Sequence, residues 1–396
     1  MAQDSLKVLD HVPALEAAFV GHIGNQSLIA QARIIQGSHK VGRKSYTGFQ
    51  DWLEFTTKTA AEINERLRSA EGDATLCLDS LEKGRDLLDK IKDKYVPIAK
   101  YGIPEIDGKD GIPGTPMLRH RLVVIVGPEN IGKSMFAKDQ AVNVLLSGKR
   151  VVYMCGENAK DKLFCEIIIN YVWKRFGYYL TSEHVSNIDV CPDNIKKIIN
   201  MALTEVIESG NLVLRDSYSY DSLYTEMQSD YEEHHSDVFF IDHSFALTGG
   251  FSGDNGKRNI DDLARDTKEF RKNYPVCVVV LSHPSIGAKE SIERDRSIEG
   301  SPTKGSQNLS TDADDVYVLR DNPTLRKEGL VSIENTKRRD VSRVMNNIIL
   351  KKKFEVSHFV YDEKFQATST ALSAGADDAL RKIESLYEVD NDQYVL

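Results

Sequence analysis

Four short apolar runs divide the middle of the chain, and each is followed by a polar or glycine-containing stretch. They are LVVIV at 122–126, VVYMC at 151–155, VFFID at 238–242 and VCVVVL at 276–281. Runs that are apolar at nearly every position are typical of parallel strands buried on both faces. Strands with one solvent-exposed face instead alternate apolar and polar residues. The pattern predicts an α/β fold in which a mainly parallel sheet is flanked by helices.

The first hundred residues follow a helical pattern instead, with helical segments expected at about 49–70 and 76–95. Residues 96–117 then gather prolines and glycines, which break regular structure and indicate a domain boundary. The end of the chain is small, polar and acidic. We therefore predict three parts: a helical N-terminal region with a linker helix at 1–95, a core domain at 96–367 and an acidic mobile tail at 368–396.

Composition narrows the class of protein. The 396 residues are 41% apolar and 28% charged, which is ordinary for globular domains. No apolar run approaches the roughly 20 residues needed to cross a bilayer, and the N-terminus lacks a secretory pattern. We expect an intracellular, cytoplasmic protein without membrane contact, acting in a host cytoplasm if the chain is phage-encoded. Its five scattered cysteines are expected to be reduced thiols, and a net charge of −9 restricts any nucleic-acid contact to local surfaces.

The stretch GPENIGKS at 127–134 matches the phosphate-binding loop pattern G-x-x-x-x-G-K-[ST]. It directly follows an apolar run and opens an amphipathic segment, as such a loop requires. Glycines let the backbone curl around phosphate, lysine adds a positive charge and serine offers a hydroxyl to Mg²⁺. The motif predicts an ATP and Mg²⁺ site in a P-loop NTPase, with these nucleotide-binding residues: Gly127, Asn130, Gly132, Lys133, Ser134 and Met135.

Two carboxylates follow other apolar runs. Asp242 ends VFFID, where a P-loop protein carries the aspartate that completes the magnesium shell together with Ser134. Aspartates at strand ends are also frequent structural caps. Glu157 follows VVYMC directly and could activate water as a general base, although a glutamate at a helix start fits the same position.

These motifs occur in the order found in the RecA-like core of hexameric replicative DNA helicases of the bacterial DnaB and phage type, and the chain resembles that family over about residues 96–365. The resemblance implies that Glu157 is the catalytic glutamate. It also implies that His283, in VCVVVLSHP, is a sensor linking the γ-phosphate to DNA-binding loops. A histidine there is similar to the phage and mitochondrial versions. Without the resemblance it is an ordinary polar cap.

Further matches lie toward the C-terminus. Gly305, Ser306 and Asp312 resemble the glycine-serine stretch and aspartate that precede the family's next core strand. In NTKRRD, Lys337 and Arg339 have the K-x-R spacing that the family uses as a lysine and an arginine finger on the neighbouring subunit's nucleotide. A solvated basic turn is the alternative interpretation.

The sequence departs from the family in two places. The stretch between Glu157 and Asp242 is long, with an apparent insertion at about 171–216, and the N-terminal region has no evident match. Two loops, at 248–258 and 284–306, are candidates for contact with the backbone of single-stranded DNA. The second loop balances four basic side chains with four acidic ones, so its charge alone predicts nothing.

The resemblance implies an ATP hydrolase that acts as a hexameric DNA helicase in replication, translocates on single-stranded DNA and shares its active sites between subunits. A primase or a helicase loader is a candidate partner. Two alternatives stay open: a RecA-like recombinase or recombination mediator that forms filaments on single-stranded DNA, and an ATP-dependent loader that binds protein. Rings and filaments differ only in whether a head-to-tail interface closes.

Overall fold

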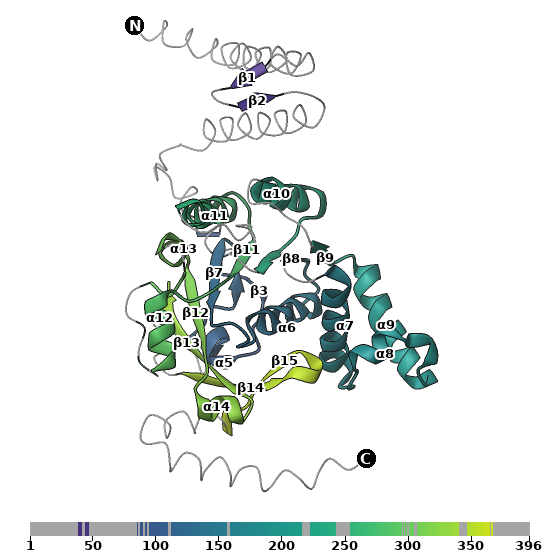
Figure 1. Cartoon of the computed structure of the whole chain (residues 1–396). Helices are drawn as coiled ribbons and strands as arrows, with labels where there is room; N and C mark the ends of the chain where they lie inside the picture. The colour runs from purple at the N-terminus through teal and green to yellow at the C-terminus, as the bar shows by residue number, and fades with distance from the viewer. Residues whose placement is uncertain are drawn as a thin grey trace, which may run out of the picture. The chain divides into compact units, whose positions relative to one another are not determined.

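The computed structural model describes residues 39–41, 44–46, 85, 88–89, 92, 95–109, 112–156, 159–215, 222–242, 254–294, 296, 298, 301–304, 307–339, 347–364 and 366. The chain divides into two compact units, residues 1–84 and 85–396. In the first unit, β1 (His39–Val41) and β2 (Lys44–Tyr46) form an antiparallel hairpin that the hydrophobic pattern did not predict (Figure 1). The helix predicted at 49–70, the tail at 368–396 and much of the segment at 76–95 lie outside the described residues.

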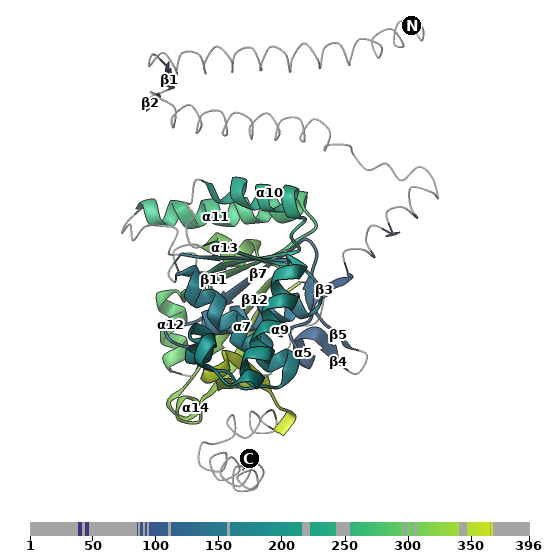
Figure 2. The same ribbon diagram turned by 90° about the vertical axis from the view of Figure 1, so that its right-hand side faces the viewer.

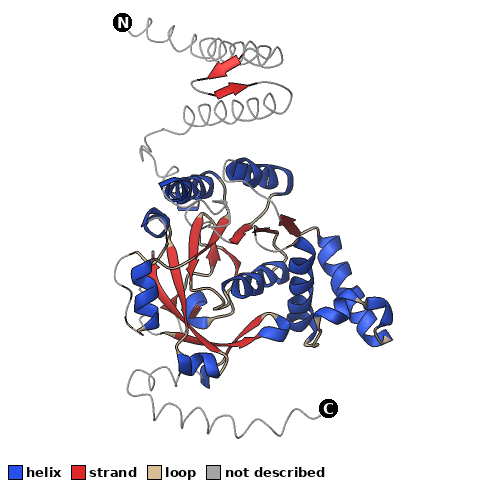
Figure 3. Cartoon of the chain, viewed as in Figure 1, coloured by secondary structure: helices blue, strands red, loops and turns tan. Residues whose placement is uncertain are grey.

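A nine-stranded sheet forms the centre of the second unit, in the order β15-β14-β13-β12-β7-β11-β10-β8-β9. Figure 3 shows its strands in red among the blue helices. The six strands from β12 to β9 are mutually parallel, and β13, β14 and β15 are added antiparallel to one side. The predicted α/β fold with a mainly parallel sheet is confirmed. The strands are β7 (Arg121–Val126), β8 (Val151–Cys155), β9 (Leu212–Arg215), β10 (Val238–Asp242), β11 (Cys277–Ser282), β12 (Asp315–Arg320), β13 (Leu330–Arg338), β14 (Ile348–Lys353) and β15 (His358–Tyr361).

Helices cover both faces of the sheet, as Figures 1 and 2 show. Successive strand residues alternate between two hydrophobic cores, so that Val123 and Ile125 join one and Leu122 and Val124 join the other. The first core takes in α6, α7 and α9, and the second takes in α10 to α13. The helices are α6 (Lys133–Leu146), α7 (Lys160–Phe176), α8 (Ser182–Ser186), α9 (Asp193–Ser209), α10 (Leu223–His234), α11 (Asp254–Asn273), α12 (Ile286–Glu293), α13 (Gln307–Asp312) and α14 (Pro323–Lys327), with 3₁₀ turns η1 (Ile188–Val190) and η4 (Phe354–Val356).

The proline- and glycine-rich lead-in to the sheet forms only short elements: β3 (Pro97–Ala99), α5 (Pro104–Asp107), β4 (Gly108–Lys109), β5 (Ile112–Pro113) and β6 (Met117–Leu118). The predicted insertion consists of the end of α7, then α8, η1, α9 and the edge strand β9. Ile195, Ile199, Ala202 and Val206 face the core at helical spacing, which explains why α9 packs there.

A buried polar network holds β15 and α7 against α6. The carboxylate of Asp139, in the middle of α6, accepts a hydrogen bond from Asn170 Nδ2 at 2.9 Å and pairs with His358 Nδ1 at 2.7 Å. Lys174 Nζ lies 2.8 Å from the same carboxylate. Burial alone would raise the pKa of Asp139, but Lys174 and His358 outweigh it and the pKa is lowered. The charged carboxylate therefore fixes α6 from two sides.

Two further findings concern the residues that the structure describes. Cys155, Cys165, Cys191 and Cys277 are free thiols. Within the described ranges, no helix is long and apolar enough to cross a membrane.

Asp315 gives a pH test of the fold. It begins β12, is buried, and lies 3.8 Å from Arg121 Nη1 at the start of β7. Burial raises the pKa of Asp315 to about 7, although Arg121 opposes the shift. The folded state therefore holds a proton that the unfolded chain releases near pH 4, and stability falls as the pH rises from about 4 to 7.

We expect Asp315→Asn to remove this pH dependence. Between pH 5 and 8 the wild type should lose roughly 2–3 kcal/mol of unfolding free energy relative to the variant. Urea denaturation across this range measures the difference. Asp262→Asn, on the exposed side of α11, is the matched control and should follow the wild-type profile. Parallel profiles for wild type and Asp315→Asn would contradict the assignment.

Candidate active site

The loop at 127–132 leaves the carboxyl end of β7 and turns into the N-terminus of α6. Two residues take the left-handed conformation that the curl requires, Asn130 at φ 61° and Gly132 at φ 108°. A side chain at Gly132 would also lie 3.1 Å from the Phe359 ring of β15. The loop is therefore shaped by local backbone geometry and by packing from β15, and it places the N–H groups of the first turn of α6 at its mouth.

Lys133 places its ammonium inside the curl of this loop. Its Nζ donates to the carbonyl oxygens of Gly127 and Pro128, each at 2.7 Å, and the residue is only 7% exposed. A positive charge is thus fixed where the loop amides also converge. Met135, predicted to touch the nucleotide, has its side chain in the hydrophobic core, so only its backbone can do so.

Ser134 and Asp242 meet at the end of the sheet. Ser134 Oγ donates to Asp242 Oδ1 at 3.0 Å, and Tyr153 Oη donates to Asp242 Oδ2 at 2.8 Å. Asp242 is buried at the end of β10, and Tyr153 comes from the neighbouring strand β8. Both carboxylate oxygens therefore have fixed positions beside the serine hydroxyl.

His283 follows β11, which lies between β7 and β10. The backbone N–H of Gly127 donates to the Ser282 carbonyl at 3.3 Å, so His283 emerges at the sheet edge that carries the P-loop and Asp242. The Lys304 N–H donates to the His283 carbonyl at 2.8 Å, which ties the histidine to the loop predicted to contact DNA. This placement is the one a sensor between the two would need.

These residues fit a magnesium–nucleotide. Mg²⁺ accepts hard oxygen ligands and usually keeps waters and substrate phosphates in its shell, so one hydroxyl and one carboxylate suffice from the protein. Ser134 and Asp242 provide them side by side. The curled loop, the buried ammonium and the helix N-terminus supply the complementary phosphate site.

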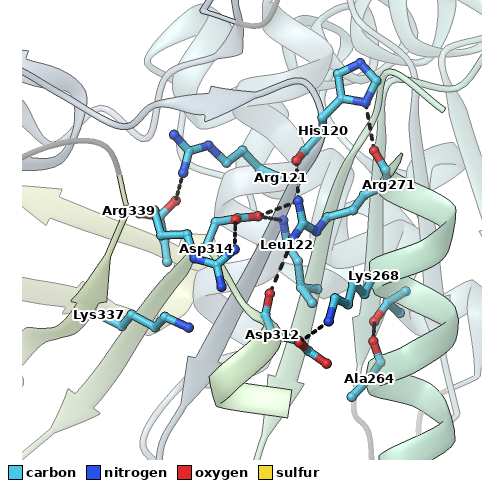
Figure 4. Close-up of polar contacts among 12 residues, drawn as sticks. His120, Arg121, Leu122, Ala264, Lys268, Arg271, Asp312, Asp314, Lys337 and Arg339 are labelled. Carbon is cyan, nitrogen blue, oxygen red and sulfur yellow. Dashed lines mark hydrogen bonds and ion pairs between the residues drawn. The ribbon is translucent and has the colours of Figure 1, made fainter. Parts of the chain in front are cut away.

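Lys337 and Arg339, which Figure 4 shows beside Asp314, lie at the edge of the sheet opposite the P-loop. β13 runs antiparallel to β12, so its end at Arg338 faces Asp315, the first residue of β12. The P-loop lies at the far end of the six-residue strand β7, about 20 Å away at the usual rise per residue. Neither side chain can reach the P-loop of its own chain.

Asp314 organises the residues at this edge. It accepts from the Leu122 N–H at 2.9 Å, from Arg271 Nη1 at 3.0 Å and from Arg339 Nη1 at 3.0 Å (Figure 4). Lys337 Nζ donates to the carbonyl oxygens of Ser310 and Thr311. Burial lowers the pKa of Lys337, and the neighbouring Arg339 lowers it further.

The residue between them has a structural role. Arg338 donates to Thr115 Oγ1 at 2.8 Å and to the Ile106 carbonyl at 2.7 Å, which anchors the lead-in segment. Successive side chains of a strand point to opposite faces of the sheet, so Arg338 points away from Lys337 and Arg339. Asp312 pairs with Lys268 of α11 at the same edge.

Several predicted residues lie outside the described part of the chain: Glu157, Gly305, Ser306 and residues 248–253 of the candidate DNA loop at 248–258. The expectation of a loop is wrong for 254–258, which begin α11, and for 286–293 within the candidate loop at 284–306, which form α12. Gly156, which precedes Glu157, donates its N–H to the Asp242 carbonyl at 3.1 Å. The sequence alone did not reveal the role of Tyr153, nor the hub at Asp314, by which we mean its carboxylate with its three donors, Leu122, Arg271 and Arg339. A tyrosine within an otherwise apolar strand was a usable signal for the first, because a buried hydroxyl needs a partner; no local signal marks the second.

Comparison with known proteins agrees with this geometry. A family model described as the DnaB-like helicase C-terminal domain matches residues 114–368, more than half of the chain. A probable plasmid replicative DNA helicase of Chlamydia trachomatis is 22% identical over 261 residues, which cover 65% of this chain and 54% of the relative. The RecA protein of Cytophaga hutchinsonii is 28% identical over 169 residues, covering 41% of this chain and 42% of that protein. The chain thus spans about half the length of the curated relatives it matches.

Solved structures share the fold. An ATPase domain of known structure superposes with a TM-score of 0.58 at 19% identity, covering 74% of this chain and all of that one. A DnaB-like replicative helicase, solved in a study of its interactions with primase, gives 0.56 at 18% identity, covering 91% and 80% of the two chains. With the family model spanning the P-loop, Asp242 and the strand that carries Lys337, the chain belongs to the DnaB-like helicase C-terminal domain family.

Proposed function

We propose that this protein is an ATP-driven DNA helicase that acts as a hexameric ring on single-stranded DNA during replication. The observation that carries the proposal is the meeting of Ser134 and Asp242 at 3.0 Å beside the P-loop, in a chain of the DnaB-like family. A bound nucleotide and Mg²⁺ supply the phosphoryl group to be hydrolysed and the cation that neutralises its charge.

The chain's own residues bind and orient the nucleotide. The loop amides and Lys133 hold the β and γ phosphates, and Ser134 and Asp242 hold the metal. Tyr153 keeps Asp242 in place. Glu157 acts as the general base toward water, and His283 relays the state of the γ-phosphate to the loop at 284–306, to which it is bound through Lys304.

Lys337 and Arg339 complete the site of the neighbouring subunit. They are at the wrong edge of the sheet for their own P-loop, and a head-to-tail ring places one subunit's edge against the next subunit's opposite edge. There the guanidinium of Arg339 stabilises charge that develops in phosphoryl transfer. A primase or a loader is the proposed protein partner, in line with the DnaB-like structure studied with primase.

The runner-up is a recombinase-like filament, which the RecA match supports over 41% of the chain. Electron microscopy with single-stranded DNA and a slowly hydrolysed ATP analogue separates the two. Closed rings support the helicase, and open filaments support the recombinase.

Tyr153→Phe tests the metal assignment. Loss of a hydrogen bond worth about 1 kcal/mol should loosen Asp242 and raise the Mg²⁺ concentration for half-maximal ATP hydrolysis about fivefold, with little change in the rate at saturating Mg²⁺. Steady-state hydrolysis over a Mg²⁺ series measures this. Tyr274→Phe is the matched control, because Tyr274 lies in the hydrophobic core on the other face of the sheet, and it should leave the Mg²⁺ curve unchanged. An unchanged curve for Tyr153→Phe would remove Asp242 from the metal site.

Mixed rings test the shared site. We expect Lys133→Ala to weaken nucleotide binding, and Arg339→Ala to retain binding but to lower DNA-stimulated hydrolysis about 10³-fold. Each variant alone is then inactive. An equal mixture should regain hydrolysis at about a quarter of the sites, because an intact P-loop meets an intact finger there. A mixture as inactive as its components would contradict action in trans. Arg326→Ala, an exposed arginine of α14, should behave as wild type.

Strand displacement tests the activity itself. The wild type should separate forked duplexes with ATP in a way that depends on a single-stranded tail, and Lys133→Ala should not. Substrates with only a 5′ or only a 3′ tail assign the direction of movement. Hydrolysis that DNA does not stimulate, together with no displacement on any fork, would favour the ATP-dependent loader.

A further inference from the structure

A cavity of about 310 Å³ lies at the sheet edge opposite the P-loop. Its walls come from the turn before β7, the last turn of α11 and the residue before β12. The size falls at the lower end of the roughly 300–1,000 Å³ typical of small-ligand sites. The lining residues are Tyr95, Arg119, His120, Arg121, Arg271, Lys272 and Asp314.

The charge of this lining is unusual for the chain. Four side chains are basic and one is acidic, in a protein whose net charge is −9. Asp314 is already shared by Arg271 and Arg339. Like charges that converge in this way repel one another, and the lining is stabilised when an anion enters.

Two cations of the lining, Arg119 and Lys272, have no side-chain partner in the part of the chain that the structure describes. Among the described residues, the side chains of Arg119 and Lys272 make no ion pair or hydrogen bond. They add two uncompensated positive charges where the structure already concentrates arginines. Surface lysines and arginines spread over a protein would not by themselves indicate a ligand, but these two line one cavity with Arg121 and Arg271.

Arg271 supplies an independent observation. The residue is only 9% exposed, and its Nε lies buried without a hydrogen-bond partner in the described part of the chain. Its Nη1 is held by the His120 carbonyl at 2.9 Å and by Asp314 at 3.0 Å (Figure 4). The guanidinium is therefore fixed in orientation while one donor stays unused, and a buried donor without a partner costs about 1–3 kcal/mol.

We propose that this cavity is a second anion site, which takes a phosphate group of a nucleotide or of a nucleic-acid backbone. Arginine forks suit phosphate geometry, and the exposed ring of Tyr95 provides a face on which a base or sugar can rest. The C-terminal carbonyls of α11 oppose an anion, but Arg271 and Lys272 in its last turn offset them. Within one chain the site is separate from the P-loop, because the two lie at opposite ends of β7. In the proposed ring this edge faces the next subunit's P-loop, so the test has to silence the P-loop of every subunit. The anion site itself does not rest on the proposed helicase function.

The test uses the full chain with Lys133→Ala, which silences the P-loop of every subunit. Binding of inorganic pyrophosphate is measured by isothermal titration calorimetry at low salt. The measurement is then repeated with a variant that carries Arg119→Gln and Lys272→Gln in addition to Lys133→Ala. Lys162→Gln with Lys197→Gln is the matched control, because it removes two exposed charges from α7 and α9 on the other face of the sheet. Thermal melts of all variants check folding, which should be unchanged at these unpaired positions.

We expect Lys133→Ala to bind pyrophosphate. The Arg119 and Lys272 pair should weaken this binding at least tenfold, and the control pair less than twofold. Displacement of pyrophosphate by a short single-stranded oligonucleotide would assign the site to nucleic-acid backbone, and displacement only by nucleotide would assign it to free phosphates. No binding in Lys133→Ala, or equal losses from the two pairs, would overturn the proposal.

Discussion

Parallel pairing of β7, β11, β10 and β8 is the constraint on which the rest of this structure depends. The pairing aligns the carboxyl ends of four strands, so that the P-loop, His283, Asp242 and Gly156 emerge at one edge in register. Because the strands are buried on both faces, a slip in register would break two cores at once. A side chain as short as serine can then meet an aspartate 108 positions away along the chain.

The same constraint divides the proposed catalytic groups between two edges. Helices, buried strands and the antiparallel β13 fix Lys337 and Arg339 about one strand length from the P-loop. No side chain spans that distance, so the basic pair either serves structure alone or serves another subunit. The proposed chemistry therefore requires oligomerisation. Lys337 and Arg339 are the side chains that one subunit would present to the next.

Features that depend only on neighbouring residues in the sequence could be predicted from it. All-apolar runs gave β7, β8, β10 and β11, and the GKS motif located the phosphate loop. The hub around Asp314 was invisible because its donors come from positions 122, 271 and 339, which only tertiary pairing brings together. Phe359 could not be connected with Gly132 for the same reason. The hairpin at 39–46 was missed because three-residue strands carry too little periodicity.

Arg339 shows how an intrachain pair can coexist with a role in trans. Its backbone is fixed, because its N–H donates to the Asp314 carbonyl at 3.0 Å, while 45% of its side chain stays exposed. Turning toward a neighbour's phosphate exchanges one charge-assisted contact for another and moves only side-chain torsions. Asp314 keeps Arg271 and the Leu122 N–H after the exchange, so its carboxylate is not left unpaired. In the proposed mechanism, the pair with Asp314 therefore holds the Arg339 side chain in place between encounters with a neighbour without blocking its use.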